Sequence, residues 1–361
     1  MPLVVLAQCV PAMVEDTGRV RPVAPGNREV IPGIFLRRTR GEAQHVVIRA
    51  CTIALIAAAL GSEAQADDLK PSGDSVIRAK AGKSEIVIRT TSRLAGAIHS
   101  LTWDGKEFID SADHGRQLQS ASNFDVGKSF IPEVFNPTEA GSRKDGAGPT
   151  STSRLLKIEA NRNQLRTLNR MAFWLEPDEK SEGYLALNTT SLSNHLLEKQ
   201  VKIGHKGMPH AIEYTTTFTV PKGENHKFAQ FEAITGYMPS EFSTFQTFDS
   251  KTGKLKPLDD GPGEQSKPIV FSTPDGSHAM GIWSPDQPSP GFGGVGYGRF
   301  RFKSEKVVKW NCVFRVQESA GIKPRSYQFR QYVIVGTLDD VQGTLVKLVD
   351  EYKPKTAPAA P

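Results

Sequence analysis

Short runs of alternating apolar and polar residues, separated by turn residues, recur along most of the chain and limit its possible folds. The first long example begins at residue 75 and reads SVIRAKAGKSEIVIRTTSRLAGAIHSLTWDGKEFID. An alternation with a period of two places successive side chains on opposite faces, which is typical of a half-buried β-strand. Asp-Gly is a favoured two-residue hairpin turn, so we predict a hairpin that turns at Asp104-Gly105.

The same pattern continues towards the C-terminus and ends in a different one. Strand pairs are predicted within RLLKIEANRNQLRTLNRMAFWL and KQVKIGHKGMPHAIEYTTTFTVP. Further strand segments are KFAQFEAITGYMP, KPIVFSTPDGSHAMGIWSP with a second Asp-Gly turn, YGRFRFKSEKVVKWNCVFRV and SYQFRQYVIVGTL. A helix is predicted within LDDVQGTLVKLVDEYK, where Asp339 and Asp340 favour a helix start. Many short strands followed by one helix predict an all-β fold, a large antiparallel β-sandwich with a C-terminal helix.

The N-terminal part of the chain has the features of a secretory signal. Arg49 precedes an apolar run from Ala50 to Leu60, and Ala64-Gln65-Ala66 is typical of a cleavage site. We therefore expect cleavage after Ala66 and a periplasmic or secreted protein. The predicted organisation is a gene-model extension or disordered leader at 1–45, a signal peptide at 46–66, one β-sandwich domain at 67–350 and a disordered tail at 351–361.

Charge and cysteine content exclude some classes of function. The net charge is +6, but the basic residues are scattered and not interleaved with aromatic ones, so nucleic acid is not an expected partner. We expect no stable membrane span once the signal is removed. Cys312 would be the one cysteine of the mature chain, expected as a small buried residue. The sequence contains no CxxC or HExxH motif, so we expect no metal and no cofactor. It does not define an oligomeric state.

The stretch DSADHGRQLQSASNFD, residues 110–125, holds the first candidate site residues. An imidazole can pass a proton near neutral pH, which makes His114 a candidate catalytic residue. The guanidinium of Arg116 can hold two sugar hydroxyls or one carboxylate. Two positions apart on a strand, these side chains would share a face. The alternative is a structural pair with Asp110 or Asp113.

A second candidate lies in the polar loop FNPTEAGSRKDGAGPTSTS, residues 135–153. Glu139 is a candidate catalytic base, and Asn136, Arg143 and Asp145 are candidate substrate-binding residues. Loops of this composition on a rigid sandwich often carry function. A solvated surface loop is the alternative.

Two aromatic residues complete the candidates, whereas three further histidines are not among them. Tyr237 would suit lyase chemistry if a basic residue lies beside it, and a core aromatic is the alternative. Trp283 can stack on a sugar ring or pack in the core. Three histidines in polar turns are expected at the surface: His205, His210 and His226.

Several short motifs resemble those of galactose mutarotase-like proteins. The segment LAGAIHSLTWDGKEFID, residues 94–110, is similar to the opening of that family. DHGRQLQSA falls where the family carries a sugar-binding Gly-Arg, and GIKPRSYQFRQYVIVG resembles a late strand pair. The resemblance implies a β-super-sandwich, a fold shared with polysaccharide lyases and glycoside hydrolase domains.

The resemblance also implies roles for particular residues. It gives Arg116 the sugar-binding role and makes His195, in LSNHLLEKQV, the counterpart of a catalytic acid histidine. The aromatic residues that follow this histidine in mutarotases are missing here. Glu318 is the nearest counterpart, by position, of their late catalytic glutamate.

Together these patterns predict an exported carbohydrate-active protein. His114, Glu139 and His195 would supply acid/base chemistry as a lyase, a hydrolase or an epimerase. The alternative is a non-catalytic carbohydrate-binding or envelope structural protein of the same fold. The density of titratable groups around His114 and Glu139 favours the enzyme, and the low aromatic content of 8% disfavours a stacking platform.

Overall fold

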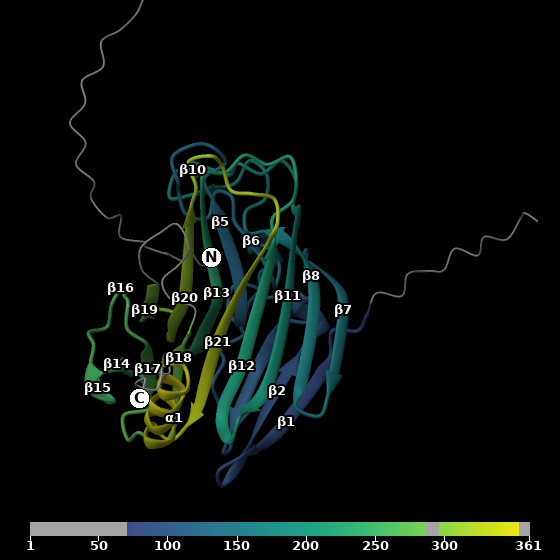
Figure 1. Ribbon diagram of the computed structural model, residues 1–361. Coiled ribbons are helices and arrows are strands. Elements are labelled where there is room, and N and C mark those ends of the chain that lie inside the picture. The colour runs from purple at the N-terminus through teal and green to yellow at the C-terminus, as the bar shows by residue number, and fades with distance from the viewer. Residues whose placement is uncertain (1–70, 286–295, 354–361) are drawn as a thin grey trace, which may run out of the picture. The chain divides into compact units, whose positions relative to one another are not determined.

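The computed structural model describes residues 71–285 and 296–353 (Figure 1). The predicted leader extension and signal peptide lie outside these residues, as does most of the predicted tail. Within the described ranges, no helix combines the length and apolar character that a transmembrane span needs.

The described strands form two antiparallel layers that are joined through the short strand β6 (Pro137–Thr138). In hydrogen-bonding order, the first layer consists of β7 (Arg154–Asn161), β8 (Gln164–Phe173), β11 (Leu192–His205), β12 (Met208–Thr219), β21 (Ser326–Gly336), β18 (Ala279–Trp283), β17 (Ile269–Ser272), β14 (Thr244–Asp249) and β15 (Lys254–Pro257).

The second layer has its own continuous order of strands. It consists of β1 (Ser75–Ala81), β2 (Ser84–Thr90), β3 (Ile98–Trp103), β5 (Leu118–Phe124), β13 (Phe228–Pro239), β20 (Val307–Gln317), β19 (Gly296–Phe302) and β16 (Gly263–Gln265). Shorter elements are β4 (Lys106–Glu107), β9 (Lys180–Ser181), β10 (Tyr184–Leu185) and the 3-10 turns η1 (Ser92–Leu94) and η2 (Arg143–Asp145). The predicted antiparallel β-sandwich is confirmed.

The predicted hairpins are present with the expected turns. Trp103 of β3 pairs with Lys106 of β4 across Asp104-Gly105. Both turn residues have positive φ angles, 49° and 76°, which match the right-handed twist of the flanking strands. The hairpins β7–β8, β11–β12 and β17–β18 are also confirmed.

Aromatic side chains fill the space between the two layers. Phe314 of β20 stacks on Phe329 of β21 with ring centroids 4.4 Å apart, and Phe231 of β13 lies 5.3 Å from the same ring. These contacts join the layers face to face, because β21 belongs to the first layer and the other two strands to the second. Cys312 is fully buried in this core, as predicted.

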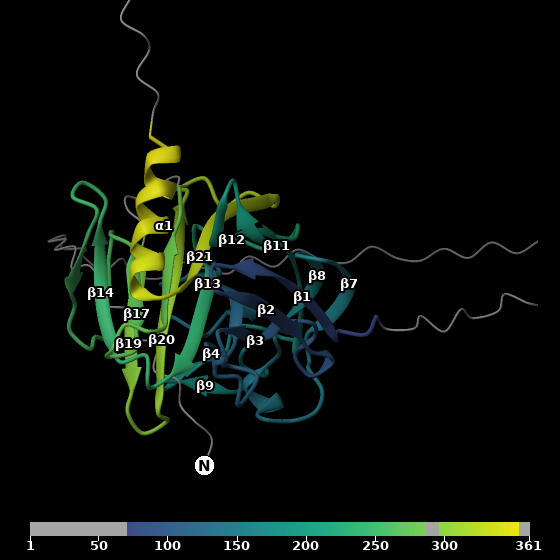
Figure 2. The same ribbon diagram turned by 90° about the horizontal axis from the view of Figure 1, so that it is seen from below.

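The C-terminal helix α1 (Leu338–Glu351) packs against β18 and β21. Figure 2 shows the helix beside β21. Thr337 caps its N-terminus in a reciprocal box with Asp340. Three apolar side chains one helical turn apart, Val341, Leu345 and Leu348, pack into a second core with Trp283 and strand residues. The predicted helix is confirmed, and its apolar face is the reason it docks on the sheet.

The expectation of surface histidines was wrong for His205, His210 and His226, which are all buried. Each occupies a polar stretch of sequence, but neighbouring carboxylates or carbonyls accept hydrogen bonds from their rings. Buried polar groups are stable where they find such partners.

Candidate functional site

A polar cleft lies over three adjacent strands of the second layer, β5, β13 and β20. Cross-strand register aligns its floor: Gln230 pairs with Asn123, Thr235 with Gln119, and Tyr237 with Lys309. Side chains alternate between the two faces of a strand, so these residues point to one side and the aromatic core residues to the other. The cleft is therefore a consequence of three strands whose outward positions are mostly polar.

A β-bulge in β13 brings Glu232 into this polar face. Glu232 and Thr235 are three positions apart in the sequence, yet their partners on β5, Ala121 and Gln119, are only two positions apart. The extra residue turns both side chains to the same side. The Thr235 hydroxyl then donates a hydrogen bond to Glu232 Oε2 at 2.9 Å.

Loop residues form the opposite wall of the cleft. Gly115, Glu133, Asn136 and Trp174 line it. Gly115 allows a close approach, because a Cβ atom at this position would lie 2.8 Å from Cη2 of the Trp174 ring. The indole thus offers an apolar surface beside polar groups, a combination suited to a sugar ring.

Glu133 is held in an unusual conformation and has an altered acidity. Its φ angle is 68°, a left-handed value that non-glycine residues seldom adopt and that is concentrated at functional sites. Its amide donates to Asn123 Oδ1 at 2.9 Å, and its carboxyl accepts from the Ser181 hydroxyl at 2.5 Å. Burial raises the pKa of Glu133, and the charge of Glu232 adds to this, against the opposing effects of Ser181 and Lys309.

Lys309 provides the positive charge of the cleft. Its ammonium lies 3.6 Å from Glu232 Oε2, with 5% and 11% of the two side chains exposed. The same ammonium lies 5.2 Å from the centre of the Tyr237 ring. Burial raises the pKa of Tyr237, although Lys309 opposes the increase. The Tyr237 hydroxyl therefore stays protonated at neutral pH.

This arrangement can support acid/base chemistry. Burial raises the pKa of Glu133, which favours a role as proton donor, while the Glu232 carboxyl group is ion-paired with Lys309. Two carboxyl groups in different environments are the usual means of separating the acid and base roles. The Gln119 amide donates to the Gly115 carbonyl, but its Oε1 has no hydrogen-bond partner among the described residues and can accept from a sugar hydroxyl.

Two of the residues predicted from the sequence lie in this cleft. Asn136 lines it and donates from Nδ2 to the Ser122 carbonyl at 2.7 Å. Tyr237 lines it beside a basic residue, Lys309, which is the condition that the sequence argument set for it. Their binding roles stay predictions.

His114 and Arg116 are bonded to the protein itself. The His114 ring nitrogens lie 2.7 Å and 2.9 Å from the carbonyl oxygens of Gly146 and Arg93, which leaves neither for a substrate proton. Arg116 forms an ion pair with Asp113 at 3.0 Å and lies 3.7 Å from Asp110. This is the structural pairing that the sequence left open as the alternative.

Glu139 lies between the layers, not in the cleft. It is fully buried and forms an ion pair with the equally buried Lys199 of β11. Its second oxygen accepts from the Ser120 amide at 3.1 Å. Adjacent residues of an extended segment face opposite ways, so Thr138 lines the cleft while Glu139 faces the core.

The remaining predicted residues are spread over the molecule. Asp145 accepts hydrogen bonds from Ser142 and Thr152 and fixes their loop. Arg143 bonds the Lys180 carbonyl and pairs with Glu179 at 3.3 Å.

Trp283 and His195 also lie outside the cleft lining. Trp283 stacks on Tyr332, with centroids 5.8 Å apart, in the core beneath α1. His195 bonds Glu224, and the two residues lie with His226 in a separate cluster.

Sequence reasoning missed Glu133, Trp174 and Lys309 as site residues. Lys309 carried a usable signal, because it interrupts the apolar strand VVKWNCVF at a position that is otherwise buried. Glu133 and Trp174 carried none, since their loops reach the cleft only in the folded chain.

No known protein family matches the sequence, and no curated protein matches it. Several solved structures have a similar fold. YeaD, a proposed mutarotase from Salmonella typhimurium, is 10% identical with a TM-score of 0.31, and the match covers 74% of this chain and 95% of that one. A heparan sulfate lyase from Pedobacter heparinus is 10% identical with a TM-score of 0.38, and the match covers 74% of this chain and 36% of the lyase.

An alpha-galactosidase from Lactobacillus brevis is 8% identical with a TM-score of 0.39, and the match covers 73% of this chain and 40% of the galactosidase. The chain thus spans well under half the length of the lyase and the galactosidase. At these identities and TM-scores the likeness concerns the fold alone and gives no information on activity.

Proposed function

We propose that this protein is an exported carbohydrate-active enzyme that uses the cleft over β5, β13 and β20 for acid/base chemistry on a sugar. The observation that carries the proposal is the pairing, in one cleft, of Glu133, whose pKa is raised, with Glu232, which is ion-paired to Lys309. The Trp174 surface and the surrounding amides supply groups that bind a sugar ring and its hydroxyls.

The charge of the cleft favours a neutral sugar over a uronic acid. Among the described residues that line it, Lys309 is the cation, and Glu232 already balances that charge. Elimination on a uronic acid is favoured by a cation that neutralises the substrate carboxylate, but Arg116 and Arg143 are ion-paired with Asp113 and Glu179. Hydrolysis or epimerisation of a neutral sugar therefore fits better than β-elimination.

The test is a screen of neutral and uronic oligosaccharides and polysaccharides with the purified chain and the variant Glu133→Gln. We expect new reducing ends or an altered anomeric ratio with neutral sugars, without the absorbance of unsaturated uronates. A general acid contributes about 10²–10⁴-fold to the rate, so Glu133→Gln should lose at least about 100-fold in kcat. The exposed Glu159→Gln is the matched control and should keep full activity.

Two outcomes would contradict parts of the proposal. Turnover of uronic polymers alone would contradict the preference for neutral sugars that we infer from the charge of the cleft. Binding of a glycan without turnover at any pH would favour the alternative, a carbohydrate-binding protein that uses the same cleft. Export is tested separately by N-terminal sequencing of the mature protein, for which we expect a start at Asp67.

A further inference from the structure

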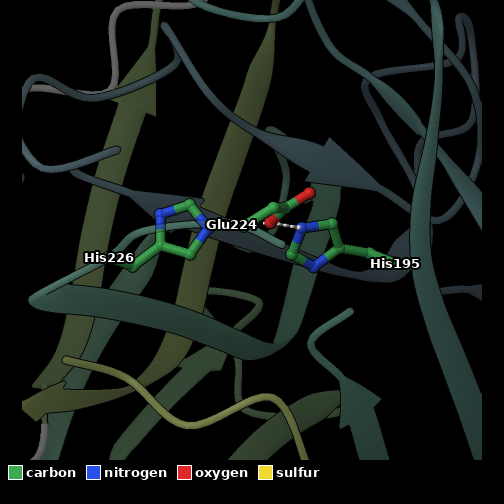
Figure 3. Close-up of side chains that lie close together, drawn as sticks. All are labelled: His195, Glu224 and His226. Carbon is green, nitrogen blue, oxygen red and sulfur yellow. Dashed lines mark hydrogen bonds and ion pairs between the residues drawn. The ribbon is translucent and has the colours of Figure 1, made fainter. Parts of the chain in front are cut away.

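Two histidines and a glutamate converge outside the cleft (Figure 3). His195 lies in β11, and Glu224 and His226 lie in the loop between β12 and β13. Glu224 Oε2 lies 2.8 Å from Nε2 of His195 and 2.7 Å from Nε2 of His226. One donor atom of each residue falls within 4.8 Å of the other two. Twenty-nine positions separate His195 from Glu224, so the chain closes a loop to bring them together.

An aromatic side chain lies against both imidazole rings of this cluster. Both imidazole rings are buried and pack on the Phe124 ring, with centroids 4.8 Å and 4.6 Å away. The Glu224 side chain is 22% exposed, so the cluster has one side open to solvent. A carboxyl group and two imidazoles are thus held together at a partly open position.

We propose that His195, Glu224 and His226 bind a divalent transition metal ion with zinc-like ligand preferences. Two imidazole nitrogens and one carboxylate oxygen form a set that suits Zn²⁺ and leaves a fourth tetrahedral position for water. The solvent-facing side of Glu224 provides room for that water. None of the three residues lines the cleft, so this site is separate from the proposed sugar site.

The donor atoms must shift to hold such an ion. Metal–ligand distances of about 2.0–2.2 Å place neighbouring tetrahedral donors roughly 3.3 Å apart. The two nitrogen–oxygen distances are now 2.7 Å and 2.8 Å, which are hydrogen-bond lengths, and all three donor atoms lie within 4.8 Å of one another. Each nitrogen–oxygen pair must therefore separate by about half an ångström, while the two imidazole nitrogens take up the same tetrahedral spacing. The ion would replace the protons that the two imidazoles now share with Glu224.

A second carboxylate lies behind one of the ligands. Nδ1 of His226 is buried and has no hydrogen-bond partner among the described residues, and Asp125 Oδ1 lies 4.0 Å from it. Metal-binding histidines usually donate their other N–H group to a carboxylate, which fixes the ring for coordination. Asp125 is held for this position, since its Oδ1 accepts from the Lys227 amide at 2.9 Å. If the His226 ring turns when the metal binds, its Nδ1 can donate to the Asp125 carboxylate, which explains why this nitrogen is buried beside it.

The test is metal binding by the purified full chain after removal of metal with EDTA. We expect one equivalent of Zn²⁺, measured by elemental analysis, and a Zn²⁺-dependent rise in the thermal unfolding midpoint. Co²⁺ in place of Zn²⁺ should give the visible d–d absorption of a tetrahedral site. This spectrum reports the coordination geometry of the unmutated protein, so the test does not depend on any variant that fails to fold.

Variants then identify the ligands. Glu224→Gln keeps the shape of the side chain but should lower Zn²⁺ affinity by more than about 100-fold, whereas Asp125→Asn should lower it about 10–100-fold, as expected for an outer partner. His205→Gln is the matched control, because His205 is also buried between two carboxylates, those of Glu213 and Glu351. It should bind Zn²⁺ as the unmutated protein does.

Two results would overturn the proposal. One is a chain that takes up less than about a tenth of an equivalent of Zn²⁺ and shows no tetrahedral Co²⁺ spectrum. The other is Zn²⁺ binding that Glu224→Gln leaves unchanged, since the ion would then be held elsewhere. Neither result bears on the sugar site, which is tested by turnover with Glu133→Gln.

Discussion

The buried ion pair between Glu139 and Lys199 allows a quantitative test of whether Glu139 is structural. Neither side chain has any exposed area, and Glu139 also accepts a hydrogen bond from the Ser120 amide. Lys199→Met removes the ammonium but fills much of the same volume, so its main effect is to leave a buried carboxylate without its cation. Breaking a buried pair in this way costs about 3–5 kcal/mol of the free energy of unfolding.

The magnitude is large enough to measure without ambiguity. Domains are typically stable by about 5–15 kcal/mol, so Lys199→Met should remove a large fraction of the total. The assay is urea unfolding followed by tryptophan fluorescence. The unfolding free energies of the variants are compared with one common slope of free energy against urea concentration. The double variant Glu139→Leu/Lys199→Met removes both charges and should recover most of the loss, because apolar replacement of a whole buried pair is often neutral or better.

A matched control uses the exposed pair of Lys157 and Glu159, which are 2.7 Å apart and more than half exposed. Lys157→Met should cause no measurable loss, because solvent screens exposed pairs. A loss below about 1 kcal/mol for Lys199→Met would refute the reasoning, as would a double variant that is less stable than the single one. Either result would mean that Glu139 does not need Lys199 in the folded state.

Three further predictions follow from single contacts. Burial raises the pKa of Glu133 above its usual 4.5, so the folded state holds this proton more tightly than the unfolded state, and the resulting stabilisation is lost as pH rises through the folded pKa. The unfolding free energy of the unmutated chain should therefore fall relative to that of Glu133→Gln between pH 4.5 and neutrality. A difference between the two that stays constant with pH would contradict this. Gly115→Ala would place a Cβ atom 2.8 Å from the Trp174 ring and so displace the ring. Calorimetry should then show weaker glycan binding with a near-unchanged melting temperature. Unchanged affinity would exclude Trp174 from binding. Thr337→Ala removes the hydroxyl that accepts from the Asp340 amide at 3.1 Å and should cost about 0.5–2 kcal/mol in urea unfolding, while Thr337→Ser should restore most of it.

The candidate site could be predicted only in part, because its residues come from segments far apart in the sequence. Tyr237 and Asn136 were found because an aromatic hydroxyl and a loop amide are informative residue types in any context. Lys309 could have been found as a charge within an apolar strand. His226 was misplaced at the surface because a polar turn gives no indication that Glu224 and His195 will enclose it.

Some residues were assigned the right chemistry but the wrong surroundings. Glu139 is a charged group with a partner, yet its partner is Lys199, across the core, and not a substrate. His114 does use both ring nitrogens, but for the carbonyls of Gly146 and Arg93. A titratable residue in a loop has the same appearance in sequence whether it faces a ligand or another loop.

The sequence by itself determined the strands, the turn at Asp104-Gly105, the terminal helix and hence the all-β class. These depend on the period of apolar residues and on turn preferences, which are interactions between neighbours in the chain. The tertiary structure alone decided that β5, β13 and β20 lie side by side and that the bulge in β13 turns Glu232 towards Lys309. It also decided that His195 meets Glu224 and His226. Those contacts depend on strand order and register, which are set by the packing of the whole core and not by any local stretch of sequence.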